Sequence, residues 1–198
     1  GMSTNYQGSR WNPANYSAPI HIGENCSLWI TGLPNDITYS ELLASITDCG
    51  RIFSSYINYP DFHAGQYFAA AKVVFFTRSG AHNLMRAGLT IRGRPAVITP
   101  NRIRVAESQL PSDHTRVLRI TGPAGLVNVP ALAQILHDHQ VMYGLDRIIE
   151  RDTTGVWNPD IEWRFASYRC QARLAKDIIS RLLGNRVRVE YAPDPCGG

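Results

Sequence analysis

Apolar and polar residues alternate along part of the first half of the chain, the period expected of a strand with one buried face. In residues 28–33, Leu28 and Ile30 alternate with Trp29 and Thr31. Three further segments predict strands, residues 52–58, 67–76 and 96–105, the last interrupted by a proline. Four strands are therefore expected before the middle of the chain.

Helical signals separate these strands. Thr38 and Glu41 have the spacing of a capping box, in which the Thr38 hydroxyl accepts from the Glu41 amide and the carboxylate returns to Thr38. The helix that follows is predicted to run to Cys49, because Gly50 is a typical residue after a helix end. A second helix is predicted after the third strand, with three residues facing the core: Ala81, Leu84 and Met85.

The second half of the chain repeats this order. Residues 117–122, V-L-R-I-T-G, align with residues 27–32, S-L-W-I-T-G, and share the tripeptide I-T-G. Asn128 can cap a helix, and an apolar stripe predicts another; the residues of the stripe are Leu174, Ala175, Ile178, Ile179 and Leu182. Strands are predicted at residues 145–151, 161–165 and 186–191. The order β-α-β-β-α-β therefore occurs twice.

Segments without an apolar period divide the chain into parts. The heptapeptide S-Q-L-P-S-D-H contains a proline and no period, as is typical of a linker. The N-terminal segment is polar and predicts a flexible tail. The expected parts are a tail at 1–23, a first domain at 24–107, a linker at 108–114 and a second domain at 115–196.

Two strand sequences of the first domain resemble those of a known family. The hexamer L-W-I-T-G-L begins at Leu28, and the octamer F-A-A-A-K-V-V-F begins at Phe68. With their spacing, they resemble the two central strands of the RNA recognition motif. The resemblance implies an α+β fold with two tandem ferredoxin-like βαββαβ domains, each a four-stranded antiparallel sheet backed by two helices.

The resemblance also implies a binding surface for single-stranded RNA on the outer sheet face of the first domain. Trp29 keeps the aromatic position of the hexamer, whereas Ala70 and Lys72 stand where the family usually has two aromatics. Because strand residues alternate between faces, Val74 is expected to face outward with them. The expected RNA-binding residues are Trp29, Tyr56, Asn58, Phe68, Ala70, Lys72, Arg102 and Arg104. The alternative is that the tail or the second domain covers Trp29.

The second domain departs further from the family. Arg119 stands where the first domain has Trp29. The alternation from Ile161 to Phe165 favours Trp163 and Phe165 facing the core, which leaves Glu162 and a neighbouring arginine outside. A register shifted by one residue would instead turn both aromatics outward and restore a stacking surface.

Composition narrows the classes of function. The net charge is +4, and only Lys72 and Lys176 are lysines, so arginine supplies the remaining basic side chains. No C-x-x-C pair is present, and the thiols are expected to be reduced. His137 and His139 lie on different faces of a helix, so no metal site is expected. Because no nucleotide or triad motif occurs, we expect neither an enzyme nor a cofactor.

The sequence thus favours a non-catalytic RNA-binding protein whose partner is single-stranded RNA or single-stranded DNA. We expect an intracellular protein, nuclear or cytoplasmic, because no membrane-spanning or secretory segment is found. The alternative is a protein-interaction module that has lost most base-stacking aromatics. Its sheet faces would then bind a protein partner or a second copy of the chain.

Overall fold

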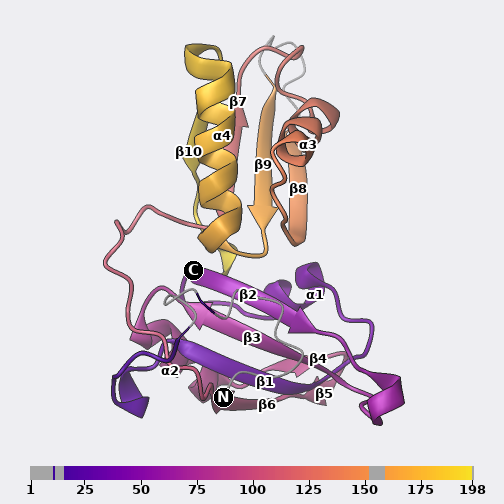
Figure 1. Ribbon diagram of the computed structural model, residues 1–198, viewed down its shortest axis with the longest axis vertical. Helices are drawn as coiled ribbons and strands as arrows, with labels where there is room; N and C mark the ends of the chain where they lie inside the picture. The colour runs from indigo at the N-terminus through magenta and orange to yellow at the C-terminus, as the bar shows by residue number, and fades with distance from the viewer. Residues whose placement is uncertain (1–10, 12–15, 152–158, 198) are drawn as a thin grey trace.

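The strands form two four-stranded antiparallel sheets and one small hairpin (Figure 1). The computed structural model describes residues 11, 16–151 and 159–197. The sheet orders are β2-β3-β1-β6 and β10-β7-β9-β8. Counted within each half of the chain, the two sheets share one order, with the first strand between the third and the fourth. This order confirms the expected α+β class with two tandem ferredoxin-like domains, which is the fold of the RNA recognition motif.

The first sheet and its two helices, here called the first domain, follow the predicted order. The strands predicted at residues 28–33 and 52–58 are found there, whereas the last strand is shorter than its predicted window. The elements are β1 (Ser27–Leu33), α1 (Tyr39–Ala44), β2 (Ile52–Asn58), β3 (Ala69–Phe75), α2 (Arg78–Ala87), the hairpin of β4 (Thr90–Ile91) and β5 (Arg94–Pro95), and β6 (Val97–Pro100).

The second sheet and its helices, here called the second domain, repeat this order. Asn128 caps the first helix, as predicted, by accepting a hydrogen bond from the amide of Ala131 at 2.9 Å. The elements are β7 (Val117–Thr121), α3 (Val129–Asp138), β8 (Leu145–Arg151), β9 (Asp160–Phe165), the turn η4 (Tyr168–Ala172), α4 (Arg173–Leu183) and β10 (Arg188–Tyr191).

Helix α1 is shorter than predicted. The Thr38 hydroxyl accepts from the Glu41 amide at 3.2 Å, but the Glu41 carboxylate binds the guanidinium of Arg92 at 2.6 Å. Half of the capping box is therefore made. The predicted end at Cys49 is wrong, because the amides of Cys49 and Gly50 donate to a carbonyl of the C-terminal segment and not to the helix.

Two predicted apolar stripes are narrower than expected. In α2, Ala81 and Leu84 are buried, but Met85 is 42% exposed, so its predicted inward position is wrong. In α4, the central residues of the stripe are buried, whereas Leu174 and Leu182 at its two ends are exposed. Each helix packs one face on its sheet, and these three side chains lie beyond the contact.

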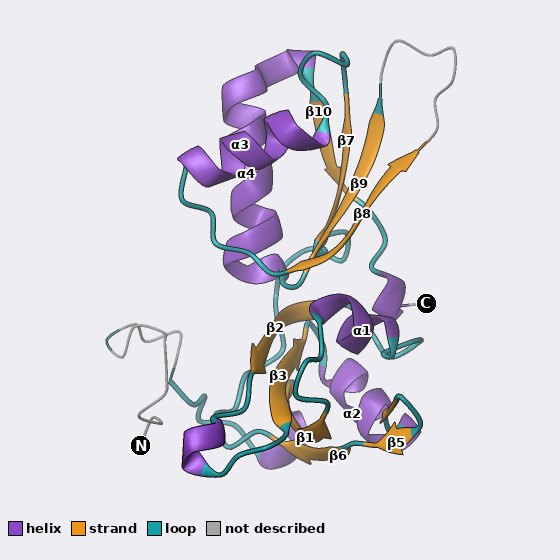
Figure 2. Cartoon of the chain, turned by 90° about the vertical axis from the view of Figure 1, so that its right-hand side faces the viewer, coloured by secondary structure: helices purple, strands orange, loops and turns teal. Residues whose placement is uncertain are grey.

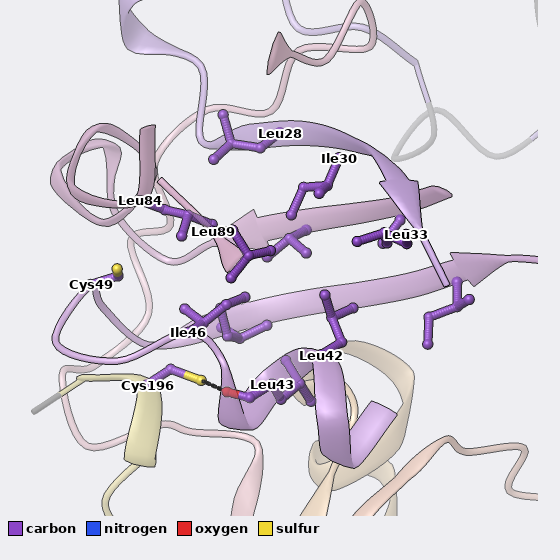
Figure 3. Close-up of a cluster of buried hydrophobic side chains, with 14 of the residues drawn as sticks. Leu28, Ile30, Leu33, Leu42, Leu43, Ile46, Cys49, Leu84, Leu89 and Cys196 are labelled. Carbon is purple, nitrogen blue, oxygen red and sulfur yellow. Dashed lines mark hydrogen bonds between the residues drawn. The ribbon is translucent and has the colours of Figure 1, made fainter. Parts of the chain in front are cut away.

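Residues of the second domain complete the core of the first. Ala166 and Cys196 are fully buried in the apolar cluster beneath the first sheet. Figure 3 shows Cys196 beside α1, where its thiol donates to the carbonyl oxygen of Leu43 at 3.4 Å. Gly144 lies so close to the ring of Tyr39 that a Cβ there would meet the ring at 2.6 Å. The two domains are thus packed together.

A buried group of ion pairs lies at the contact between the two domains. The guanidinium of Arg116 contacts the carboxylates of Asp146 at 2.7 Å and Asp194 at 3.0 Å. Asp194 also accepts from the amide of Ile52 in β2 at 2.8 Å and from that of Cys196 at 3.1 Å. One carboxylate therefore connects the second domain, the first sheet and the C-terminal segment.

The segments predicted as tail and linker make contacts of their own. Residues 1–10 and 12–15 of the predicted tail lie outside the described residues. Ala18 donates to the carbonyl of Arg104, so the described part of the tail is hydrogen-bonded to the first domain. In the predicted linker, the carbonyls of Pro111 and His114 accept from the guanidinium of Arg51. Composition alone gives no reason to expect these contacts.

Candidate nucleic-acid interface

A row of side chains crosses the outer face of the first sheet. Lys72 in β3 is the direct neighbour of Trp29 in β1 and of Tyr56 in β2, and Trp29 is opposite Thr99 in β6. Side chains of directly opposite residues share one face of a sheet. Trp29 and Lys72 are half-buried and Tyr56 is 42% exposed. The structure thus brings a cation between two aromatic residues.

A second row lies next to the first. Asn58 in β2 is opposite Ala70 in β3, and both are half-buried. Phe68 precedes buried Ala69, so alternation places it on the outer side, where it is 59% exposed. Five of the eight predicted binding residues therefore belong to one face of one sheet, and Phe68 lies directly before it, at the entry to β3.

The two predicted arginines lie beyond the sheet. Strand β6 ends at Pro100, and the side-chain oxygen of Asn101 accepts from the amide of Ile103 at 3.1 Å, which turns the chain away. The guanidinium of Arg104 donates to the carbonyl of Ile20 at 2.5 Å, so it holds the N-terminal segment. Arg102 is exposed. Neither is in the register of the aromatic row.

The second domain covers one end of the outer face. Tyr168 packs its ring against Phe76 at 5.2 Å and Phe53 at 5.9 Å, measured between ring centroids. Phe76 follows inward-facing Phe75 and is therefore expected to face outward, yet it is only 1% exposed. Val74 lies on the outer face by strand alternation, as predicted. It is only 1% exposed, however, so it is not accessible to solvent. The row around Lys72 lies beyond this covered end.

The environment of Lys72 places its pKa below the ordinary value of a lysine. Burial lowers the pKa of its ammonium group, and the nearby positive charge of Arg169 in the second domain lowers it further. A neighbouring anion would offset both effects, because opposite charge favours the charged form.

Exposed aromatic residues around the β2–β3 loop were not predicted as part of the site. Phe62 is 56% exposed and Tyr67 is 65% exposed, and their ring centroids are 6.2 Å apart. Tyr59, also 56% exposed, donates its hydroxyl to the carbonyl of Ile37 at 3.1 Å. The density of aromatic residues between positions 59 and 68 was the available signal. Phe62 and Tyr67 thus add exposed rings to the loop that leads to Phe68.

The outer face of the second sheet carries paired charges. Arg119 binds Asp160 at 2.6 Å, and Glu162 binds Arg151 at 2.5 Å and Arg164 at 2.7 Å. Burial raises the pKa of Glu162, but hydrogen bonds from these two arginines outweigh it and hold that pKa below the ordinary 4.5.

The aromatic residues of β9 lie on the other face of the second sheet. Trp163 and Phe165 are buried beneath it, at 1% and 0% exposure, which confirms the inward register. The described part of the second sheet thus offers no outward aromatic on β9 for base stacking.

The outer faces of the two sheets point to opposite sides of the molecule. In Figure 2, α3 and α4 lie on one side of the second sheet, whereas α1 and α2 lie on the other side of the first sheet. The outer face of the first sheet therefore shares its side with the helices of the second domain. A nucleic-acid strand that lies on the first sheet would therefore approach the second domain on the side of α3 and α4.

Similarities to known proteins were found among solved structures. No family model and no curated protein matches the chain. Among solved structures, RNA recognition domains 1 and 2 of Sex-lethal from Drosophila melanogaster share 20% identity over 85% of this chain and 100% of that one, with a TM-score of 0.31. The first two such domains of the yeast poly(U)-binding protein share 18% identity over 84% and 99%, with a TM-score of 0.34.

A third solved structure, of Hrp1 in complex with RNA, shares 13% identity over 86% of this chain and 98% of that one, with a TM-score of 0.34. Because these scores and identities are low, the fold stated above rests on the strand order of each sheet. Among the described residues, no helix combines the length and apolar character needed to span a bilayer, and no group of three metal-ligating side chains occurs.

Proposed function

We propose that the chain binds single-stranded RNA, or single-stranded DNA, on the outer face of the first sheet. The observation that carries this proposal is the row Trp29–Lys72–Tyr56 across three neighbouring strands. Aromatic side chains stack on bases of any sequence, which contributes about 1–3 kcal/mol per base. A lysine between two stacked bases is placed to bind the phosphate that joins them.

Tyr56 offsets part of what the octamer lacks. The family usually has aromatics at the positions of Ala70 and Lys72, and their replacement removes two stacking positions on β3. Tyr56 supplies one ring on the neighbouring strand, in register with Lys72. Phe68 supplies another at the start of β3. We therefore expect binding with little sequence preference, because stacking and charge dominate over base-edge contacts.

The second domain has a supporting role in this proposal. Arg119, Arg151 and Arg164 of its sheet are already paired with carboxylates, so they are poor ligands for phosphates. It holds β2, the strand that carries Tyr56, in place through hydrogen bonds to Ile52 and Ser55.

The test is fluorescence anisotropy of labelled random single-stranded RNA over a salt series. We expect binding that weakens as salt rises, with a log–log slope of about −0.7 for each phosphate contacted. No binding at low salt would refute the proposal.

A second candidate function is binding of a protein partner or of a second copy. The exposed aromatics Phe62, Tyr67 and Phe68 favour it, because clustered apolar side chains on a surface often mark protein contacts. This function predicts a pulldown that resists RNase and is lost in Trp29→Ala. Loss of the captured protein on RNase treatment would instead support the RNA proposal.

A further inference from the structure

The turn η4 between β9 and α4 has an unusual backbone. Arg169 is extended, with φ −62° and ψ 127°, and Cys170 has φ 60°, in the left-handed region. Residues other than glycine rarely adopt a positive φ, and they keep it where the surrounding structure holds the chain in place. The turn thus has a defined conformation, and Arg169 lies in its non-helical part, before α4 begins.

Hydrogen bonds fix this turn to β2 beside the aromatic row. The amide of Ser55 donates to the hydroxyl of Ser167 at 2.8 Å, and that hydroxyl donates to the carbonyl of Ser55 at 3.1 Å. The Ser55 hydroxyl donates to the carbonyl of Ala166 at 2.7 Å. Ser55 is the neighbour of Tyr56, and Ser167 is two residues from Arg169. The arginine therefore starts at the edge of the proposed RNA surface.

Two positive charges approach each other at this edge. Arg169 is half-buried, and its charge contributes, after burial, to the lowered pKa of Lys72. Like charges in proximity repel, and a shared anion removes the repulsion. A guanidinium binds a phosphate with two parallel hydrogen bonds, whereas an ammonium binds it as a point charge. Together they suit one phosphodiester group.

We propose that Arg169 binds a backbone phosphate of the nucleic acid on the first sheet, next to the phosphate-binding position of Lys72. The second domain then contacts the strand through its β9–α4 turn and not through its sheet. This inference rests on the proposed function, and it gives a reason why the two sheets can face opposite sides of the molecule.

The test compares salt slopes of RNA binding for single variants of the full chain. For Arg169→Ala we expect about tenfold weaker binding and a slope smaller in magnitude by about 0.7, because one phosphate contact is lost. Arg169→Lys should keep the slope, since it keeps the charge. The matched control is Arg181→Ala, an exposed arginine near the other end of α4, which should change neither value.

Trp29→Ala separates this inference from the proposed function. It should weaken binding and leave the slope unchanged, because it removes a stacked base and no charge. If Trp29→Ala weakens binding while Arg169→Ala keeps the wild-type affinity and slope, the inference is overturned and the proposed function stands. If neither variant changes binding, both are overturned.

Alkylation of Cys170 gives a second readout that needs no variant. Cys170 is exposed and follows Arg169, whereas the other three cysteines are buried. Burial also raises the pKa of Cys26 to about 11 and that of Cys196 to about 12. We expect iodoacetamide to label Cys170 first, and saturating RNA to slow that labelling several-fold. An unchanged rate on RNA-saturated protein would place the strand elsewhere and overturn the inference.

Discussion

Substituting Asp194 with alanine should destabilise the whole chain, because this carboxylate has buried partners in both domains. The side chains of Asp194 and Arg116 are 0% and 1% exposed. Breaking a buried ion pair by removing one partner typically costs about 3–5 kcal/mol, since the other charge stays buried. Arg116 keeps the carboxylate of Asp146 at 2.7 Å, which lowers this cost. The amides of Ile52 and Cys196 lose their acceptor, at about 1–3 kcal/mol each.

These contributions share one site and are not additive, so we expect a total loss of about 3–5 kcal/mol. A typical domain is stable by about 5–15 kcal/mol, so such a loss is a large fraction of the total. Urea unfolding followed by far-ultraviolet circular dichroism measures it. Asp194→Asn should lose less than Asp194→Ala, because the amide oxygen still accepts from Ile52.

The matched control is Asp177→Ala, an exposed aspartate of α4, which should change stability by less than about 0.5 kcal/mol. A loss below about 1 kcal/mol for Asp194→Ala would contradict this expectation. It would mean that the domains hold together without this carboxylate.

Two further predictions concern the junction and the second sheet. Gly144→Ala should weaken the contact between the domains, because the added Cβ would meet the ring of Tyr39 at 2.6 Å. A thermal melt measures this loss of stability. An unchanged melting temperature would contradict the close packing of Gly144 against Tyr39. The carboxyl of Glu162 has a pKa below its ordinary 4.5, so its contribution to stability is present above that pH and is lost as the pH falls through the lower folded value. Glu162→Gln should therefore reduce the fall of the urea midpoint as the pH is lowered below 4.5. A urea midpoint with the same pH dependence as that of the wild type would show that the ion pairs of Glu162 do not contribute to stability.

Local patterns in the sequence predicted most of the fold. The alternation around Trp29 identified β1 and the face on which its side chain lies. Thr38 and Asn128 marked two helix starts through short-range hydrogen bonds with residues three positions ahead. The inward position of Trp163 also followed from alternation. Such signals are readable because partners are close in sequence or repeat with a fixed period.

The contacts between the domains could not be predicted in this way. Cys196 carries no sign that it belongs to the core of the first domain, since its partner Leu43 is 153 positions away. The carbonyl of Cys196 also accepts from the amides of Cys49 and Gly50, between α1 and β2. Asp194 and Ser167 are likewise ordinary polar residues in the sequence. Their roles depend on how two domains meet, which no local pattern encodes.

The candidate site was predicted in part. Trp29, Tyr56 and Lys72 were named from the resemblance to the RNA recognition motif and from strand alternation, and the register of the sheet places them in one row. Arg104 was named because it lies close to the last strand in sequence, but that strand ends earlier and the side chain holds the N-terminal segment. Arg169 was missed, because it comes from the other domain.

The most direct test of the central claim is the affinity of Trp29→Ala for labelled random single-stranded RNA, measured by anisotropy beside the wild-type chain. We expect a loss of about 1–3 kcal/mol, or about 5- to 150-fold, with an unchanged melting temperature. Met142→Ala, at a side chain of the second domain that is 84% exposed, is the control and should bind like wild type. Equal affinities of the folded Trp29→Ala variant and the wild type would contradict the claim that bases stack on the first sheet.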